Sequence, residues 1–251
     1  MFNHQVVLVT GGGKGIGRGI TDAMLDAGIR VAVVQRSPID PYLEAHECIL
    51  PIQADLSQED SFQSVVEETV TRFGRLDCLV NNAGVMFERS LMEMRLEEWD
   101  SMMALNLRSP MFLSQAALPY LKKSPNASII NIGSVEGLMS NPLHAAYASS
   151  KAAIHGLTRA LAVDLGPYGI RVNAIAPGWI RSELSDSYLQ SQAQPETATQ
   201  DLLKLHPVGR VGQPQDIGDV AVFLASERAS FITGQVVVVD GGRTVQLPLP
   251  F

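Results

Sequence analysis

Residues 6–19, VVLVTGGGKGIGRG, decide the fold, because a short β-branched run ends there in a glycine-rich turn. An apolar run of this kind is typical of a strand buried in a parallel sheet. Glycines let the backbone come close to a diphosphate, and a helix that follows them offers unpaired N–H groups and the positive end of its dipole. A glycine-rich turn is often only a turn, but its place between a first strand and a helix favours phosphate binding.

The same alternation of apolar run and helical pattern continues through most of the chain. Near-continuous apolar strands separated by helices predict a parallel sheet covered on both faces, and right-handed crossovers make it doubly wound. We therefore expect an α/β fold: one Rossmann-type domain, residues 1–251, with seven strands flanked by helices. The runs lie at 5–10, 30–35, 48–53, 76–81, 127–133, 170–176 and 235–240, and the helical patterns near 15–28, 59–73, 96–123, 146–165 and 214–226.

Two segments depart from this alternation. Residues 37–47, SPIDPYLEAHE, contain two prolines and no good helical period, so we expect an irregular connection or a single turn. Residues 182–206 are polar and rich in Ser and Gln. They are either a mobile surface insertion or a lid over the substrate, since long loops in compact domains are often functional.

Composition excludes several classes of protein. A net charge of −7 leaves no basic surface for nucleic acid or an anionic membrane, and no apolar run approaches the length of a membrane helix. The first residues enter a strand pattern at once and do not resemble a signal peptide. We expect a cytoplasmic protein without a catalytic metal, because the five histidines are scattered and Cys48 and Cys78 have no partner at metal spacing. Both cysteines are interpreted as buried, inert thiols.

Residues of distinctive chemistry follow the predicted strands in turn. In an open parallel sheet, ligands bind outside the carboxyl ends of the strands. Residues far apart in sequence should therefore meet in one crevice. They are Thr10 and the glycines, Asp55, Asn81 to Gly84, Ser134, Pro177 and Gly178.

Tyr147 and Lys151 lie four residues apart in a predicted helix and so share one face. A phenol is a poor base at neutral pH, but a neighbouring ammonium favours the phenolate. With the hydroxyl of Ser134, this pair suits proton transfer at an alcohol oxygen. Taken alone, the pattern is weak, since a surface Tyr often packs along a Lys stem.

The end of the second strand bears on the choice of cofactor. An acidic residue there binds the ribose hydroxyl of NAD, whereas an Arg nearby accommodates the phosphate of NADP. Here Gln35 occupies the acidic position, Arg36 follows it, and Lys14 adds a second cation. Unless these cations are simply solvated surface charges, the residues favour NADP(H) over NAD(H).

Together these motifs resemble those of the short-chain dehydrogenase/reductase family, from Val6 to about Gly242. They comprise TGGGKGIG at 10–17, Asp55, NNAG at 81–84, Asn106, Ser134, Tyr147, Lys151, and Pro177-Gly178. The resemblance implies that Tyr147 is the general acid/base and that Ser134 orients the substrate oxygen. It also implies that Lys151 lowers the pKa of Tyr147 and holds the nicotinamide ribose. Asn106 would hold a water in a proton relay, unless it only kinks or caps a helix.

The same resemblance implies a set of cofactor contacts. Ser182 stands where Thr is common, which keeps the hydroxyl, and Gly133 stands where a second Ser is common, which removes a minor contact. The expected contacts are Gly11, Lys14, Gly15, Ile16, Gly17, Arg36, Asp55, Leu56, Asn82, Ala83, Gly84, Tyr147, Lys151, Pro177, Gly178, Ile180 and Ser182.

Family members of this type are commonly tetramers, so the resemblance implies a homotetramer with helices near 96–123 and 146–165 between subunits. The second of these segments is rich in Ala and Gly, which permits close approach of helices. The chain ends in the apolar sequence QLPLPF, residues 246–251, which we expect to dock on a neighbouring subunit.

The leading hypothesis is an NADP(H)-dependent oxidoreductase that moves a hydride between nicotinamide and a carbonyl or secondary alcohol. The alternatives are an NAD-dependent sugar or alcohol dehydrogenase of the same family and a non-catalytic dinucleotide-binding regulator. The small-molecule substrate stays open between a polyol and an apolar ketone. Candidate substrate contacts are Glu136, His144, Trp179 and Leu184.

Overall fold

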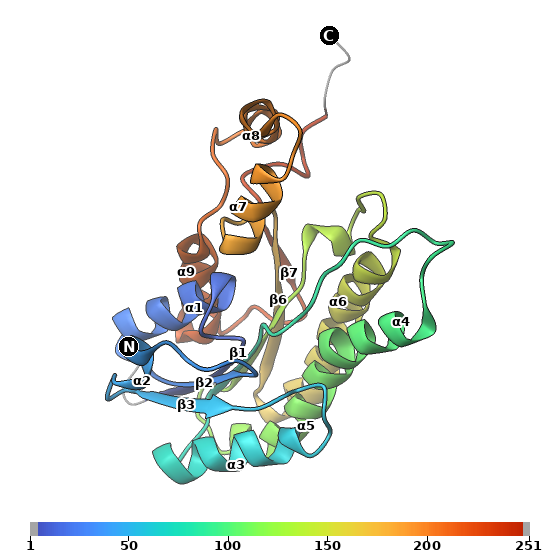
Figure 1. Ribbon diagram of the computed structural model, residues 1–251. Coiled ribbons are helices and arrows are strands. Elements are labelled where there is room, and N and C mark those ends of the chain that lie inside the picture. The colour runs from blue at the N-terminus through green and yellow to red at the C-terminus, as the bar shows by residue number, and fades with distance from the viewer. Residues whose placement is uncertain (1–4, 248–251) are drawn as a thin grey trace.

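A seven-stranded parallel sheet forms the centre of the protein in a computed structural model, which describes residues 5–247 (Figure 1). The strand order is β3-β2-β1-β4-β5-β6-β7, so the order reverses between β1 and β4. The predicted doubly wound sheet is confirmed. The strands are β1 Val6–Thr10, β2 Arg30–Gln35, β3 Ile49–Gln53, β4 Cys78–Asn81, β5 Ser128–Ile132, β6 Arg171–Pro177 and β7 Val236–Val239.

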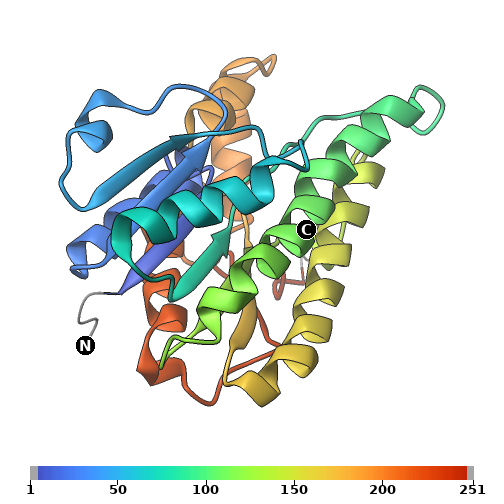
Figure 2. The same cartoon turned by 90° about the horizontal axis from the view of Figure 1, so that it is seen from below.

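Two layers of helices cover the sheet, because alternate strand residues are apolar on both faces. Helices α1 Gly15–Asp26 and α9 Pro214–Ala225 pack on the face that carries Val7 and Val9. On the other face, against Val6 and Leu8, pack α3 Ser61–Phe73, α5 Ser109–Leu121 and α6 Ala145–Leu165. Figure 2 shows these three helices, in cyan, green and yellow, side by side.

The predicted helix over 96–123 is interrupted. The chain forms α4 Leu96–Met103, a π-helical turn Ala104–Arg108, and then α5. Asn106 is buried within that turn. A π-helical turn holds one residue more than the backbone of an α-helix needs, and such turns are frequent at functional sites.

The two irregular segments also contain helix. Between β2 and β3 the chain makes one short helix, α2 Pro41–Glu44, capped by the Asp40 carboxylate, as the prolines predict. Residues 182–206, predicted only as a polar insertion or lid, form α7 Glu183–Gln190 and α8 Pro195–Lys204. Their starts at the Ser182 cap and Pro195 were visible in the sequence, but their polar composition hid the helical period.

Three further expectations concern the cysteines, membrane spans and the chain end. Cys78 is buried as predicted, but Cys48 is half-exposed, because it precedes β3 at the edge of the sheet. Within residues 5–247, no helix is long and apolar enough to cross a membrane, and no three His, Cys, Asp or Glu side chains are grouped as metal ligands. The predicted docking of QLPLPF falls mostly on residues 248–251, outside the described chain.

Candidate functional site

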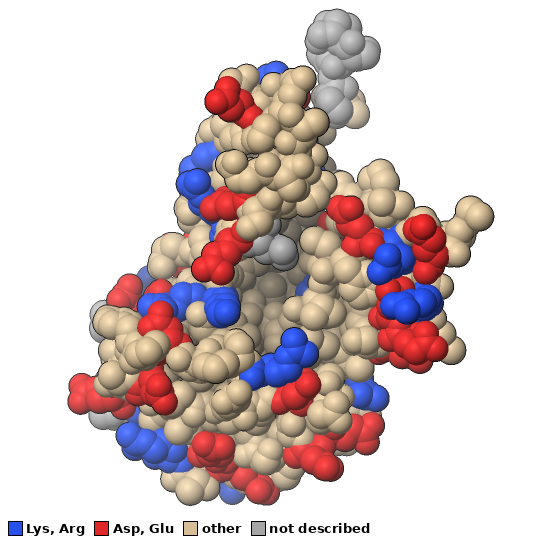
Figure 3. All heavy atoms as spheres, in the orientation of Figure 1, with Lys and Arg blue, Asp and Glu red and all other residues tan. Residues whose placement is uncertain are grey.

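A cleft of about 1240 Å³ opens at the carboxyl edge of the sheet, where the strand order reverses. Figure 3 shows the hollow beneath the α7–α8 segment. Most of the predicted site residues line it: Gly11, Lys14, Gly15, Ile16, Gly17, Asn82, Ala83, Gly84, Ser134, Tyr147, Lys151, Pro177, Gly178, Ile180 and Ser182. Arg36, Asp55, Leu56, Asn106, Glu136, His144 and Trp179 lie outside the lining.

The glycine turn is shaped as a cradle at one end of the cleft. Gly11 and Gly15 have positive φ angles of 64° and 50°, which side chains rarely adopt. A Cβ on Gly17 would overlap the carbonyl of Gly11, so the helix can approach the turn only without a side chain there. No side chain caps α1 at Lys14, which leaves its first N–H groups available to an anion. The residues present therefore fit the diphosphate of a dinucleotide.

Thr10 and Asn82 fix this cradle to the end of β4. The Thr10 hydroxyl accepts hydrogen bonds from the backbone N–H groups of Asn82 and Ala83, both at 2.9 Å. The Asn82 side chain donates to the Thr10 carbonyl at 2.8 Å and to the Gly11 carbonyl at 3.2 Å. The supporting role of Asn82 was not predicted from the sequence, since only the tertiary fold brings it beneath the turn.

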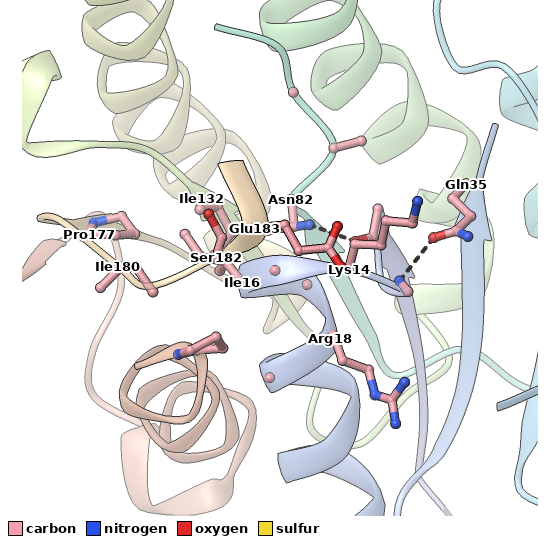
Figure 4. A pocket seen from close by; sticks show the side chains of 18 of the residues that line it. Lys14, Ile16, Arg18, Gln35, Asn82, Ile132, Pro177, Ile180, Ser182 and Glu183 are labelled. Atoms are coloured by element: carbon pink, nitrogen blue, oxygen red, sulfur yellow. Dashed lines mark hydrogen bonds between the residues drawn. The ribbon is translucent and has the colours of Figure 1, made fainter. Parts of the chain in front are cut away.

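Gln35 has a second role that sequence reasoning missed. Its side-chain oxygen accepts from the Gly13 N–H at 3.1 Å, and its amide donates to the Pro38 carbonyl at 2.8 Å (Figure 4). The residue in the acidic position therefore binds the glycine turn and the β2–α2 connection.

Both cations and carboxylates lie at this end of the cleft, since Lys14, Arg18, Asp22 and Asp40 all line it. Lys14 lines it and is exposed, whereas Arg36 is exposed outside the lining. Arg18, which the sequence analysis did not single out, also lines the cleft (Figure 4). Its Nε is 2.8 Å from Asp22 Oδ1, and its Nη1 is 3.7 Å from Asp40 Oδ2.

Asp55 lies half-buried just after β3. It accepts a hydrogen bond from the Ser57 N–H at 2.9 Å. Hydrogen bonds from Ser57, assisted by the charge of Arg36, lower the pKa of the Asp55 carboxyl. Leu56 beside it is buried in the core.

Tyr147, Ser134 and Lys151 meet at the other end of the cleft, where β5 ends against α6. The Ser134 hydroxyl hydrogen-bonds the Tyr147 phenol and accepts from the Glu136 N–H at 3.1 Å. Lys151 is buried, and its Nζ donates to the Ile132 carbonyl at 2.9 Å while lying 5.6 Å from the centre of the Tyr147 ring. The structure thus brings these three side chains together in one cleft.

The pKa of Tyr147 lies above its ordinary value, and the predicted lowering of this pKa by Lys151 stays a prediction. Burial raises it to about 12, although the hydrogen bond from Ser134 acts in the opposite direction. Burial also lowers the pKa of the Lys151 ammonium to about 8. In this state the phenol is protonated at neutral pH and can donate its proton to a carbonyl oxygen.

Asn106 holds the loop after β4 against α6. Its side-chain oxygen accepts from the Val85 N–H at 2.8 Å, and its amide donates to the Val85 carbonyl at 2.9 Å and the Ser150 hydroxyl at 3.0 Å. A Cβ on Gly84 would lie 3.2 Å from Asn106 Oδ1 and 3.7 Å from Lys151 Nζ. The side chain is therefore occupied by structural contacts, and its part in a water relay stays a prediction.

The candidate substrate residues lie around the outer end of the cleft. His144 Nδ1 is 2.7 Å from Glu136 Oε2, its Nε2 is 3.6 Å from Glu88 Oε1, and its ring meets the Tyr147 ring edge-on. His144 follows Leu143, whose φ of 66° is unusual for a residue other than glycine. Trp179 packs against Tyr188 of α7, and the side chain of Leu184 is outside the described part of the structure.

Comparison with known proteins agrees with this geometry. The family described as enoyl-(acyl carrier protein) reductase matches residues 11–244. A 3-oxoacyl-[acyl-carrier-protein] reductase of Thermotoga maritima is 35% identical over 96% of this chain and 98% of its own length. The L-fucose dehydrogenase of Bos taurus is 38% identical over 96% of this chain and 90% of its own.

Solved structures give the same result. The ligand-free aldohexose dehydrogenase of Thermoplasma acidophilum has a TM-score of 0.90 at 32% identity and covers 98% of this chain and 96% of its own. Levodione reductase has a TM-score of 0.90 at 30% identity, and the match covers 98% of this chain and 100% of that protein. The protein is therefore a member of the short-chain dehydrogenase/reductase family, an NAD(P)-dependent oxidoreductase that acts on CH–OH groups or the corresponding carbonyls.

Proposed function

We propose that this protein is an NADP(H)-dependent oxidoreductase in which Tyr147 is the general acid/base for a carbonyl or secondary alcohol. The observation that carries the proposal is that Ser134, Tyr147 and Lys151 line the same cleft as the glycine turn. The bound cofactor supplies the hydride chemistry, while the protein supplies position and proton transfer. A non-catalytic regulator would have no need of this arrangement.

In carbonyl reduction, the Tyr147 phenol donates its proton to the substrate oxygen, which the Ser134 hydroxyl orients. The Lys151 ammonium stabilises the phenolate that remains, and it would also hold the nicotinamide ribose hydroxyls of a bound cofactor. Asn106 supports a water on the path to Lys151. In alcohol oxidation, the proton moves in the reverse direction. Asp55 and Leu56 would hold the adenine of a bound cofactor, and Ile180 and Ser182 would hold its nicotinamide end.

The substitution Tyr147→Phe tests this role. We expect kcat to fall by about 10²–10⁴, the range of general acid catalysis, while the dissociation constant of the cofactor stays within about twofold. The measurement is oxidation of NADPH and NADH with ethyl acetoacetate, cyclohexanone and D-glucose as carbonyl probes. Turnover in the variant equal to that of the wild type would refute the assignment. If the wild type turns over none of the probes and none of the corresponding alcohols, the result would favour the non-catalytic dinucleotide-binding regulator.

Preference for NADP(H) is supported by Lys14 and Arg36, and by an amide instead of a carboxylate at Gln35. Arg18 adds a third cation, although Asp22 and Asp40 partly neutralise it. We expect NADPH to bind more tightly than NADH, and Arg36→Asp to reverse the preference. Titrations of nicotinamide fluorescence measure both constants. Tighter NADH binding by the wild type would instead favour the NAD-dependent dehydrogenase.

The rim of the cleft bears on the substrate. Val85 and Met86 line the cleft with exposed side chains, and Leu138, Met139 and Leu143 are exposed on the facing loop. This apolar rim supports a substrate with an apolar body, although the Glu136–His144 pair could instead bind the hydroxyls of a polyol. Residues 182–206 would act as the lid, since Ser182 and Glu183 line the cleft at the start of α7.

The assembly completes the proposal. A row of small residues along α6 is partly or fully exposed, namely Ala145, Ala148, Ala152, Ala153 and Gly156. Exposed Val163 extends this row. These features support a homotetramer in which α6 packs against a second copy, and we place it in the cytoplasm only by analogy with its family.

A further inference from the structure

One buried histidine has no role in the proposed mechanism. His155 lies on α6 one turn after Lys151 and two turns after Tyr147, and its exposed fraction is 2%. Burial, with the charges of Arg159 and Lys151, lowers the pKa of His155 to about 4, so the ring is neutral at physiological pH. A buried neutral ring affects its neighbours by the space that it occupies.

The His155 ring fills the space that side chains at Gly133 and Gly137 would need. A Cβ on Gly133 would overlap Nε2 and lie 2.8 Å from Cδ2. A Cβ on Gly137 would overlap Cε1 and lie 2.6 Å from Nδ1 and 2.9 Å from the Lys151 carbonyl carbon. The ring is therefore in direct contact with the backbone at both glycines.

These two glycines are the ends of the turn that carries Ser134. Gly133 follows β5, its N–H donates to the Ile175 carbonyl of β6 at 2.7 Å, and the Gly137 N–H donates to the Ser134 carbonyl at 2.9 Å. The turn is thus tied to the sheet on one side and rests on the His155 ring on the other. Tyr147 and Lys151 project from the same helix as that ring.

We propose that His155 is a positioning residue, which sets how far the Ser134 turn, residues 133–137, stands from Tyr147 and Lys151. Its effect on turnover rests on the proposed function of those residues. The contact also accounts for Gly133 at the position where the family resemblance suggests a second Ser, since a hydroxymethyl group and the imidazole cannot share the space.

His155→Ala removes the support and should let the Ser134 turn move toward the helix. A displacement of about 1 Å at a reacting group can cost about 10²-fold, so we expect kcat to fall at least tenfold. The probe is the one of the three carbonyl compounds that the wild type reduces fastest. The KM for that probe and the dissociation constant of the cofactor should both stay within about threefold of the wild-type values. The pH midpoint of alcohol oxidation should also shift, because the displaced Ser134 hydroxyl would no longer keep its native distance from the Tyr147 phenol. Wild-type kcat and pH midpoint in this variant would overturn the proposal.

A double-mutant cycle tests the contact independently of turnover. Gly133→Ser should destabilise the wild type in urea unfolding but destabilise the His155→Ala background much less, because the void accepts the new side chain. Additive effects in the two backgrounds would contradict the contact. If the Gly133→Ser protein does not fold on its own, a folded Gly133→Ser/His155→Ala protein supports the contact between His155 and Gly133. A double variant that also fails to fold contradicts that contact. Arg159→Gln, an exposed change that removes the neighbouring charge, is the control and should match the wild type.

If the wild type reduces no probe, the proposed function fails while this cycle still decides whether the contact exists. If the wild type is active and the cycle is additive, the positioning role alone fails.

Discussion

At the scale of single residues, the site combines a phenol and an ammonium whose pKa values burial moves in opposite directions. Tyr147 rises to about 12, and Lys151 falls to about 8. Burial penalises the charged form of each group, so the neutral phenol and a less basic amine are favoured. The cation beside the phenol is therefore held at a cost in stability.

The substitution Lys151→Met measures that cost. Lowering this pKa from 10.5 to about 8 corresponds to roughly 3 kcal/mol at pH 7, since each pKa unit is worth about 1.4 kcal/mol. Loss of the hydrogen bond to Ile132 offsets part of it, about 1 kcal/mol. We expect the free energy of unfolding to rise by about 1–2 kcal/mol in urea titrations while turnover is lost.

The pH dependence of this difference provides the check. Between about pH 8 and 10.5 the unfolded wild type binds more protons at Lys151 than the folded protein, so wild-type stability rises with pH relative to the variant. The gap between the two proteins should therefore narrow over that range. A gap that is constant from pH 7 to 10.5 would show that burial of the ammonium is not its cause.

The residue types of the site were predictable from the sequence, whereas their electrostatics were not. The spacing of Tyr147 and Lys151 placed both on one helix face, and the end of the fifth strand placed Ser134 opposite them. The direction of the Tyr147 pKa depends on how deeply the ring is buried, which spacing does not report. The contacts of Gln35 and His155 depend on approaches between distant segments and were missed for the same reason.

At the scale of elements, α1 and α9 pack closely because glycines face each other across the contact. A Cβ on Gly19 would overlap the backbone of Pro214, and a Cβ on Gly218 would overlap the Gly19 carbonyl and lie 2.8 Å from the Ala23 Cβ. This close packing positions the amino end of α1, and with it the glycine turn, against the residues at the start of α9 that line the cleft.

The substitution Gly218→Ala should separate these helices. We expect a loss of about 1–3 kcal/mol of stability, the usual range for overpacking, together with weaker cofactor binding. Gly166→Ala is the matched control, because Gly166 has an α-helical conformation and open space around its Cβ. That change should leave the stability within about 0.5 kcal/mol of the wild type, because the lower entropy of the unfolded chain is offset by the clash of a Cβ with the ring of Pro167. Urea unfolding measures the stability of both variants. Equal changes in the free energy of unfolding for Gly218→Ala and Gly166→Ala would contradict the packing argument.

The strands were predicted to within about two residues because buried parallel strands have a strong apolar signature. The π-helical turn was not predicted, because it depends on the contacts of Asn106 with Val85 and Ser150 and no local sequence pattern indicates it. The α7 and α8 helices were missed because little of their surface is buried; in α8, Leu202 is the buried residue.

At the scale of the whole molecule, the exposed row of small residues on α6 leads to a prediction about assembly. Ala152→Arg places a long cation in a face that we expect to contact a second copy, and it should reduce the mass from tetramer to dimer or monomer in light scattering. Thr197→Arg, on the exposed surface of α8, is the control and should leave the mass unchanged. A monomeric wild type, or equal masses for both variants, would contradict the proposed tetramer.

The packing of α1 against α9 also has a consequence for biosynthesis. Helix α1 is synthesised nearly 200 residues before α9, the helix that it packs against. Until then Ile20 and Met24, which are fully buried in the finished protein, lack part of their cover. Nascent chains therefore expose this apolar surface of α1 until α9 is synthesised. During that interval a chaperone would be needed to prevent aggregation.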